Sequence, residues 1–110
     1  MLKNGRPYTI MEFGFVDDEL LTDCTQEEQK VVLNWIRENF IPSEKHYRNI
    51  TSYSLKHALE HSTGIYLTNN QFKDAMMMCG YNPVDCNWLN WEYCISKKSP
   101  ALNLPTRYYV

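Results

Sequence analysis

The sequence predicts an α+β domain of the winged helix-turn-helix type, with three helices, a C-terminal β-hairpin and an extra N-terminal strand. Three observations favour this fold. Two helical patterns follow one another between residues 52 and 80, a third precedes them, and an alternating segment occupies 89–96. A helix pair followed by a hairpin is the element order of a winged helix, in which the second helix contacts nucleic acid and the hairpin is the wing.

The 110 residues are expected to form one domain, because 44% of them are hydrophobic and 14% are aromatic. We divide the chain into an N-terminal strand and acidic connector (1–24), a winged-helix-like core (25–99) and a C-terminal tail (100–110). No apolar run is long enough to span a membrane, and the first residues lack the pattern of a signal peptide. We therefore expect a cytoplasmic protein, with its four cysteines reduced.

Charge is distributed unevenly along the chain. The net charge of −2 divides into −5 over residues 1–44 and +3 over residues 45–110. The molecule is therefore predicted to be bipolar. A basic C-terminal part that carries the helix pair and the hairpin is compatible with phosphate binding.

The N-terminal part begins with a predicted strand at residues 7–15, where β-prone residues predominate. From Glu12 to Glu28 there are seven acids and no base. One interpretation is a solvated connector whose last acids favour the positive end of the next helix. The other is a phosphate-like surface offered to a basic site on another protein. On that second interpretation the acidic binding candidates are Glu12, Asp17, Asp18, Glu19 and Asp23.

The first predicted helix begins at Thr25 and ends before Pro42. Thr25 and Glu28 have the spacing of a capping box, in which each side chain accepts a hydrogen bond from the other residue's backbone N–H. Val32 and Ile36 then recur at helical spacing and should face the core. Proline lacks an amide hydrogen, so the helix stops before it.

The second predicted helix has Ser52 as its cap and Gly64 at its end. Its apolar residues define an inner face, and its polar residues, Lys56, His57, Glu60 and His61, are expected to point outward. His57 and His61 are spaced so that they could share a zinc ion, but further ligands at zinc spacing are missing. We predict exposed histidines and no metal site.

The third predicted helix has the clearest signals in the chain. Thr68 and Gln71 form a capping box, and Gly80 follows the last periodic residue. One stripe is apolar and should be buried, namely Phe72, Ala75, Met76 and Cys79. The opposite face is expected to stay in solvent, and it carries Asn69, Asn70, Lys73, Asp74 and Met77.

The predicted hairpin follows this helix. Residues 81–85 should form a short strand, with Pro83 at its edge, and residues 86–88 the bend. Four large apolar residues then alternate with smaller or polar ones, which is the strongest strand signal in the chain. These residues are Leu89, Trp91, Tyr93 and Ile95.

The predicted fold places polar side chains where nucleic acid could be contacted. Asparagine can pair with the edge of adenine, and lysine with phosphate or guanine. The candidates are Lys56, Asn69, Asn70, Lys73, Lys97 and Lys98; the alternative is that they form an ordinary solvated face. Two apolar side chains, Met77 and Trp88, suit a protein interface if they are exposed, or the core if they fold inward.

No motif of a known catalytic site is present. The chain has no Gly-rich phosphate loop, no G-x-S-x-G and no H-E-x-x-H, and it has only four glycines. We therefore predict a binding protein that is not an enzyme and that carries no cofactor.

Short motifs follow one another through the predicted core, namely Tyr53–His57, Gly64–Lys73, Ala75-Met76, Gly80-Tyr81, Leu89–Trp91 and Ile95-Ser96. In this order they resemble a family of short uncharacterised proteins of temperate phages and mobile elements of Gram-positive bacteria. The resemblance covers about residues 28–99 and implies neither a catalytic residue nor a binding site. Residues 1–24 look like an addition to the common core.

Two functions follow from these observations as hypotheses. The first is a small phage regulator or replication accessory that contacts nucleic acid through the winged-helix-like module. The second is a phage-encoded inhibitor of a host defence or replication protein, for example an anti-CRISPR, that uses the acidic segment as a mimic of nucleic acid.

Overall fold

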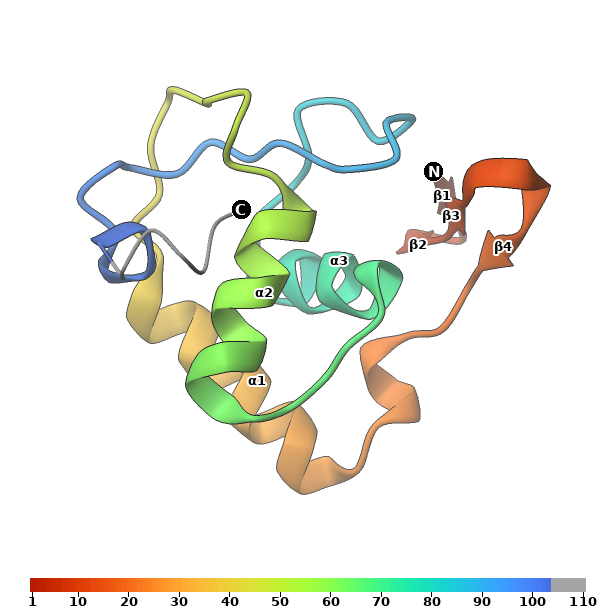
Figure 1. Ribbon diagram of the computed structural model, residues 1–110, viewed down its shortest axis with the longest axis horizontal. Helices are drawn as coiled ribbons and strands as arrows, with labels where there is room; N and C mark the ends of the chain where they lie inside the picture. The colour runs from red at the N-terminus through yellow and green to blue at the C-terminus, as the bar shows by residue number, and fades with distance from the viewer. Residues whose placement is uncertain (104–110) are drawn as a thin grey trace.

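The computed structural model describes residues 1–103 and contains three helices packed around one core (Figure 1). The helices are α1 (Gln26–Asn39), α2 (Ser52–Thr63) and α3 (Asn69–Met78), and each contacts the other two. Their apolar stripes meet as expected, because Val32, Leu55 and Phe72 are all fully buried. The three-helix part of the prediction is therefore confirmed.

Local capping signals placed the helix ends correctly, with one exception. Thr25 with Glu28, and Thr68 with Gln71, form the predicted capping boxes of α1 and α3. The cap of α2 is Thr51 rather than Ser52, because the Thr51 hydroxyl accepts the backbone N–H of Ser54. The hydroxyl of Ser52 instead accepts the N–H of Trp91 at 3.0 Å.

The strands lie in the N-terminal part, and they form two small antiparallel sheets. The first pairs β1 (Leu2–Lys3) with β2 (Arg6–Pro7), and the second pairs β3 (Thr9–Ile10) with β4 (Val16–Asp17). The single strand predicted over 7–15 is wrong. The chain reverses direction in the 3-10 turn η1 (Glu12–Gly14), where Phe13 and Gly14 have positive φ angles of 65° and 83°.

The predicted C-terminal hairpin, and with it the winged helix-turn-helix fold, is wrong. Residues 91–95 do alternate inward, but they make only single β-bridges within the described chain, to Pro42, Thr51 and Pro83. Their backbone groups pair with several loops instead of one adjacent strand; Ser52 N–H, for example, donates to the Trp91 carbonyl. Pro83 cannot donate an amide hydrogen, which prevents a longer ladder with residues 81–85.

Two short turns complete the described chain. The 3-10 turn η2 (Leu21–Asp23) inserts Leu21 into the core, and η3 (Pro100–Asn103) buries Ala101 beside α1. The predicted tail of 100–110 therefore begins as a packed turn, and its residues 104–110 lie outside the described residues. No helix in the described part of the chain has the length and apolar character needed to cross a bilayer.

Candidate functional site

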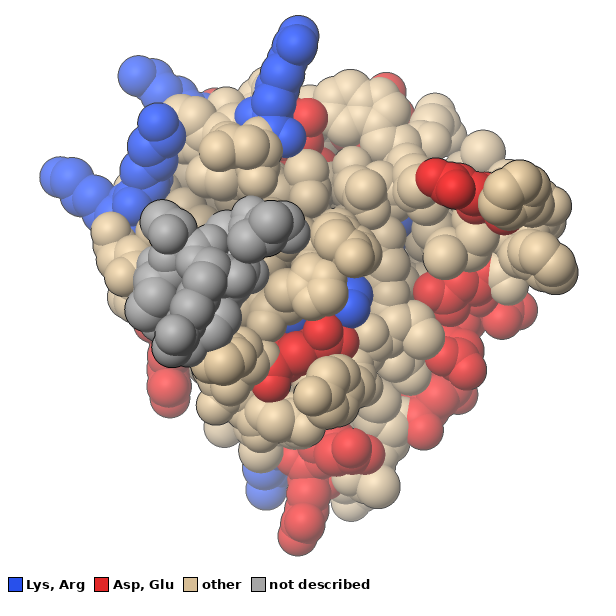
Figure 2. Space-filling model, viewed as in Figure 1, with Lys and Arg blue, Asp and Glu red and all other residues tan. Residues whose placement is uncertain are grey.

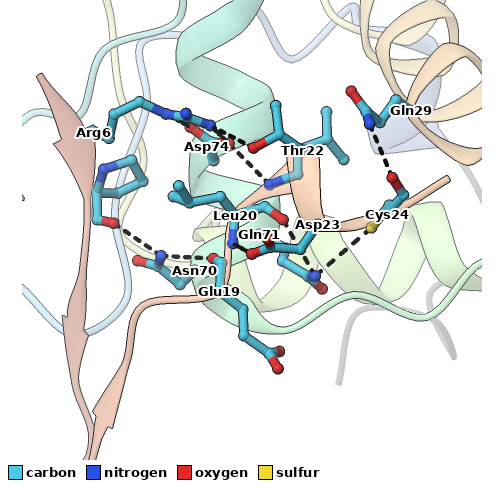
Figure 3. A network of polar contacts seen from close by, with 12 residues as sticks. Arg6, Glu19, Leu20, Thr22, Asp23, Cys24, Gln29, Asn70, Gln71 and Asp74 are labelled. Atoms are coloured by element: carbon cyan, nitrogen blue, oxygen red, sulfur yellow. Dashed lines mark hydrogen bonds and ion pairs between the residues drawn. The ribbon is translucent and has the colours of Figure 1, made fainter. Parts of the chain in front are cut away.

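The polar face of α3 is covered by the N-terminal segment, which packs against it through hydrogen bonds (Figures 1 and 3). Asn70, which was expected in solvent, is fully buried. Its amide nitrogen donates to the carbonyls of Pro7 at 2.9 Å and Glu19 at 2.8 Å, and its amide oxygen accepts the Thr9 hydroxyl at 2.9 Å. The amide is thus fully used within the fold.

Lys73 is also enclosed, with 0% of the residue exposed. Its ammonium donates to the Thr9 hydroxyl at 2.9 Å and lies 4.8 Å from the centre of the Trp91 ring. It forms no ion pair within residues 1–103. Burial lowers the pKa of Lys73 to about 8, and the negative charge of Asp17 opposes that shift only in part.

Asp74 connects α3 to two points of the N-terminal segment (Figure 3). Its carboxylate accepts both Nε and Nη2 of Arg6, at 3.1 Å and 2.6 Å, and the backbone N–H of Leu21 at 2.9 Å. The hydrogen bonds to Asp74 raise the pKa of Arg6 above its usual value. Asp74 is itself buried, so the bidentate pair with Arg6 holds β2 against α3 and the bond from Leu21 holds η2 there.

The prediction that α3 presents Asn70 and Lys73 to solvent is therefore wrong. Asn69 is half-buried and donates to the Leu89 carbonyl and the Asn90 amide oxygen. Lys56 is buried on α2 and pairs with Glu60 at 3.0 Å, so the expectation that both point outward is wrong as well. Only Lys97 and Lys98 among the six nucleic-acid candidates are exposed.

The β3–β4 hairpin exposes a group of apolar side chains that are close together in the chain. Phe13 is 93% exposed, Phe15 is 73% exposed, and Ile10, Met11 and Val16 are also exposed. We name this set the hairpin patch. The sequence interpretation missed it because a strand over 7–15 would have buried alternate residues. The available signal was the occurrence of Met11, Phe13 and Phe15 at alternate positions with Gly14 between two aromatics.

A groove of about 780 Å³ separates the hairpin from the helices. One wall carries Met11, Phe13 and Phe15, and the other carries Tyr53 of α2 and Leu89. Its lining also includes Leu67, Thr68 and Asn69, where the chain enters α3. Figure 2 shows the hairpin end standing out from the body of the molecule at the right. The groove is therefore open to solvent and largely apolar.

Acidic side chains border this groove, and Figure 2 shows others on the right side of the molecule below the projecting hairpin. Glu12 and Asp17 line it, and Glu12, Asp18, Glu19 and Asp23 are exposed. Asp17 differs from the others because it is half-buried at the start of α3, where it accepts the N–H of Asn70 and the hydroxyl of Thr68. Four of the five predicted acidic candidates are thus available to a partner.

Comparison with protein-family models, curated proteins and solved structures finds no match for this chain. The resemblance to phage and mobile-element proteins accordingly stays a prediction.

The two apolar candidates differ in exposure. Met77 is half-buried and packs against the core, whereas Trp88 is 41% exposed in the loop before Leu89. Met77 was expected on the outer face of α3, but the structure places part of its side chain against the core. Trp88 remains accessible to a partner.

Histidines and cysteines do not gather into a site in the described chain. His57 contacts Glu60 at 3.4 Å and packs edge-on against Tyr53. The four cysteines are free thiols, and burial raises the pKa of Cys24 and Cys79. Within residues 1–103, no three His, Cys, Asp or Glu side chains are grouped as metal ligands.

Proposed function

We propose that this chain is a non-enzymatic phage or mobile-element protein that inhibits a nucleic-acid-handling protein of the host by binding its basic surface. The observation that carries the proposal is Phe13, an almost fully exposed aromatic in a left-handed conformation beside exposed acids. A non-glycine residue in that conformation costs about 1–2 kcal/mol, and such strain clusters at functional sites.

The surroundings of Phe13 support a protein partner. Large exposed aromatics are the residues that contribute most to protein interfaces, while a rim of charge favours partners of opposite sign. Glu12, Asp18, Glu19 and Asp23 are exposed and supply the negative charge that a basic surface would attract. Hydrogen bonds with Asn70 and Asp74 of α3 hold Arg6, Pro7 and Glu19, on either side of the hairpin, against the body of the molecule.

Displacement from DNA tests this function. Proteins of a Gram-positive bacterial extract are bound to duplex-DNA resin and eluted with the purified chain, with polyglutamate as a control for unspecific polyanion effects. We expect the chain to release a discrete protein that polyglutamate leaves bound. The triple variant Glu12→Lys, Asp18→Lys and Glu19→Lys should release none, because its charge now repels a basic channel.

The matched control reverses charge at the other end of the molecule. Lys97→Glu with Lys98→Glu should release the same protein as the unmodified chain. Equal release by the acidic-segment variant, or no release by the unmodified chain, would reject the proposal. Asp17 is left intact because its carboxylate caps α3.

A second candidate, direct contact with nucleic acid, is favoured by one observation. Two loops carry exposed basic side chains, namely Lys45 and Arg48 on one and Lys97 and Lys98 on the other. The two loops are in contact, because the ammonium of Lys97 lies 4.3 Å from the centre of the Tyr47 ring. Figure 2 shows basic side chains gathered at the upper left, away from the acidic side. A mobility shift at low salt that disappears in Lys97→Glu with Lys98→Glu would support this function, and no shift at micromolar protein would reject it.

A further inference from the structure

The groove beside the hairpin patch has two walls that come from different parts of the fold. The hairpin supplies Met11, Phe13 and Phe15, while Tyr53 and Leu89 face it from α2 and the loop after residue 86. Both walls are exposed, since Phe15 on the hairpin is 73% exposed and Tyr53 and Leu89 opposite it are 48% and 37% exposed. Contiguous exposed apolar surface with a polar rim is typical of an interaction site.

The charge at this groove is negative. Glu12 and Asp17 are among its lining residues, and Asp18 and Glu19 follow directly in the chain. Among the described residues of the lining Lys56 is the one cation, and it is paired with Glu60 at 3.0 Å, so its charge is compensated within the fold. A ligand of the groove should therefore combine an apolar surface with positive charge.

The form of the groove favours a helix over a strand. Strand addition requires a free sheet edge with unpaired backbone groups, and β3 and β4 are only two residues long. An amphipathic helix needs only an apolar groove for one face and charges at the rim for its flanks. A membrane surface fits less well, because anionic lipids would meet Glu12, Asp18 and Glu19.

From these observations we infer that the groove between the β3–β4 hairpin and α2 binds a basic amphipathic helix of the partner protein. This inference rests on the proposed function and specifies which segment of the partner is recognised. The apolar face of that helix contacts Phe15, Tyr53 and Leu89, and its lysines or arginines meet Glu12 and the acids that follow.

Peptides of defined pattern test this inference by fluorescence anisotropy. The probe is an amphipathic peptide of leucine and lysine at helical spacing; the controls are a scrambled peptide of the same composition and a helix with glutamate in place of lysine. We expect the scrambled peptide to bind about tenfold more weakly than the probe, and the glutamate helix to show no binding. Equal binding of the scrambled peptide would overturn the inference, because charge alone would then explain association.

Single variants locate the binding surface. Tyr53→Asp and Leu89→Asp should each weaken probe binding by about tenfold, because a carboxylate would be buried in the apolar contact. Val31→Asp is the matched control, since Val31 is exposed on α1, outside the residues that line the groove. Thermal unfolding of all three variants verifies that they are folded. Binding that is equal in the groove variants and the control would overturn the inference.

Two results separate this inference from the proposed function. If the chain displaces a host protein from DNA but the helical probe binds no better than its scramble, the function stands and the groove assignment fails. If the probe binds in the groove but no host protein is displaced, the groove assignment stands and the function fails. Sedimentation of the chain alone provides a further check, since self-association that Leu89→Asp abolishes would assign the groove to a second copy.

Discussion

Replacing Lys73 by methionine should make the protein more stable at neutral pH. The lysine is fully enclosed and its pKa is lowered from 10.5 to about 8, so the folded state disfavours the charged form. The difference between these two pKa values corresponds to about 3 kcal/mol at pH 7. Methionine retains the apolar stem but loses the hydrogen bond to Thr9 and the contact with Trp91, which together offset about 2 kcal/mol. We expect a net gain of about 1 kcal/mol in the free energy of unfolding.

The pH dependence identifies the cause. Below pH 8 the lysine is protonated in both the folded and the unfolded chain, so the full penalty of burying the charge is present. Between pH 8 and 10.5 the unfolded chain binds more protons than the folded chain, and stability rises with pH. The advantage of Lys73→Met over the unmodified protein should therefore shrink across this window, while other titrating groups contribute equally to both proteins.

Urea unfolding at several pH values between 6.5 and 10.5 measures this difference. Lys98→Met is the control, because Lys98 is exposed and its replacement should change the free energy of unfolding little at any pH. A destabilised Lys73→Met at pH 7, combined with a difference that stays flat from pH 7 to 10.5, would refute the interpretation of Lys73 as a buried charge.

Three further predictions concern the N-terminal segment and the core. Asp74→Ala should lower the free energy of unfolding by about 3 kcal/mol, because Arg6 and the buried N–H of Leu21 lose the Asp74 carboxylate as acceptor. A loss below about 1 kcal/mol in urea unfolding would contradict the role of the Arg6–Asp74 pair. Tyr93→Phe should leave the free energy of unfolding unchanged or raise it by about 1 kcal/mol, because the buried Tyr93 hydroxyl has no hydrogen-bond partner in the described chain. A marked loss of stability in thermal unfolding would show that this hydroxyl is hydrogen-bonded in the folded protein. Phe13→Gly should change the free energy of unfolding by less than about 1 kcal/mol, because glycine relieves the positive φ but has more conformational entropy in the unfolded chain. The same variant should bind the probe peptide more weakly, and undiminished affinity would remove Phe13 from the site.

The helices were predictable because their signals are local. A capping box joins residues three apart, and the helix-ending glycines act through their own φ angle, so Thr25, Thr68 and Gly64 could be interpreted without knowledge of distant contacts. The apolar stripe of α3 was equally clear. The inward alternation of Trp91, Tyr93 and Ile95 was also correct, even though the strand pairing inferred from it was wrong.

The exposure of polar side chains was not predictable in the same way. Hydrophobic periodicity indicates which face of a helix avoids water, but it does not indicate whether polar partners cover the other face. Asn70 and Lys73 are buried because Pro7, Thr9 and Glu19, over fifty residues away in sequence, supply their hydrogen bonds. The hairpin patch was missed for a related reason, since only the turn at Phe13 places its aromatics in solvent.

The sequence alone determined where the helices begin and end, apart from the cap of α2, which apolar stripe of each helix faces the core, and where acidic and basic residues concentrate along the chain. Those properties depend on neighbours within a few positions or on composition. Only the tertiary structure decided that the N-terminal segment covers α3 and that the hairpin forms one wall of an apolar groove. The physical reason is that a polar group can be satisfied by water or by a distant segment at similar free energy, so its environment is set by which segments meet in space.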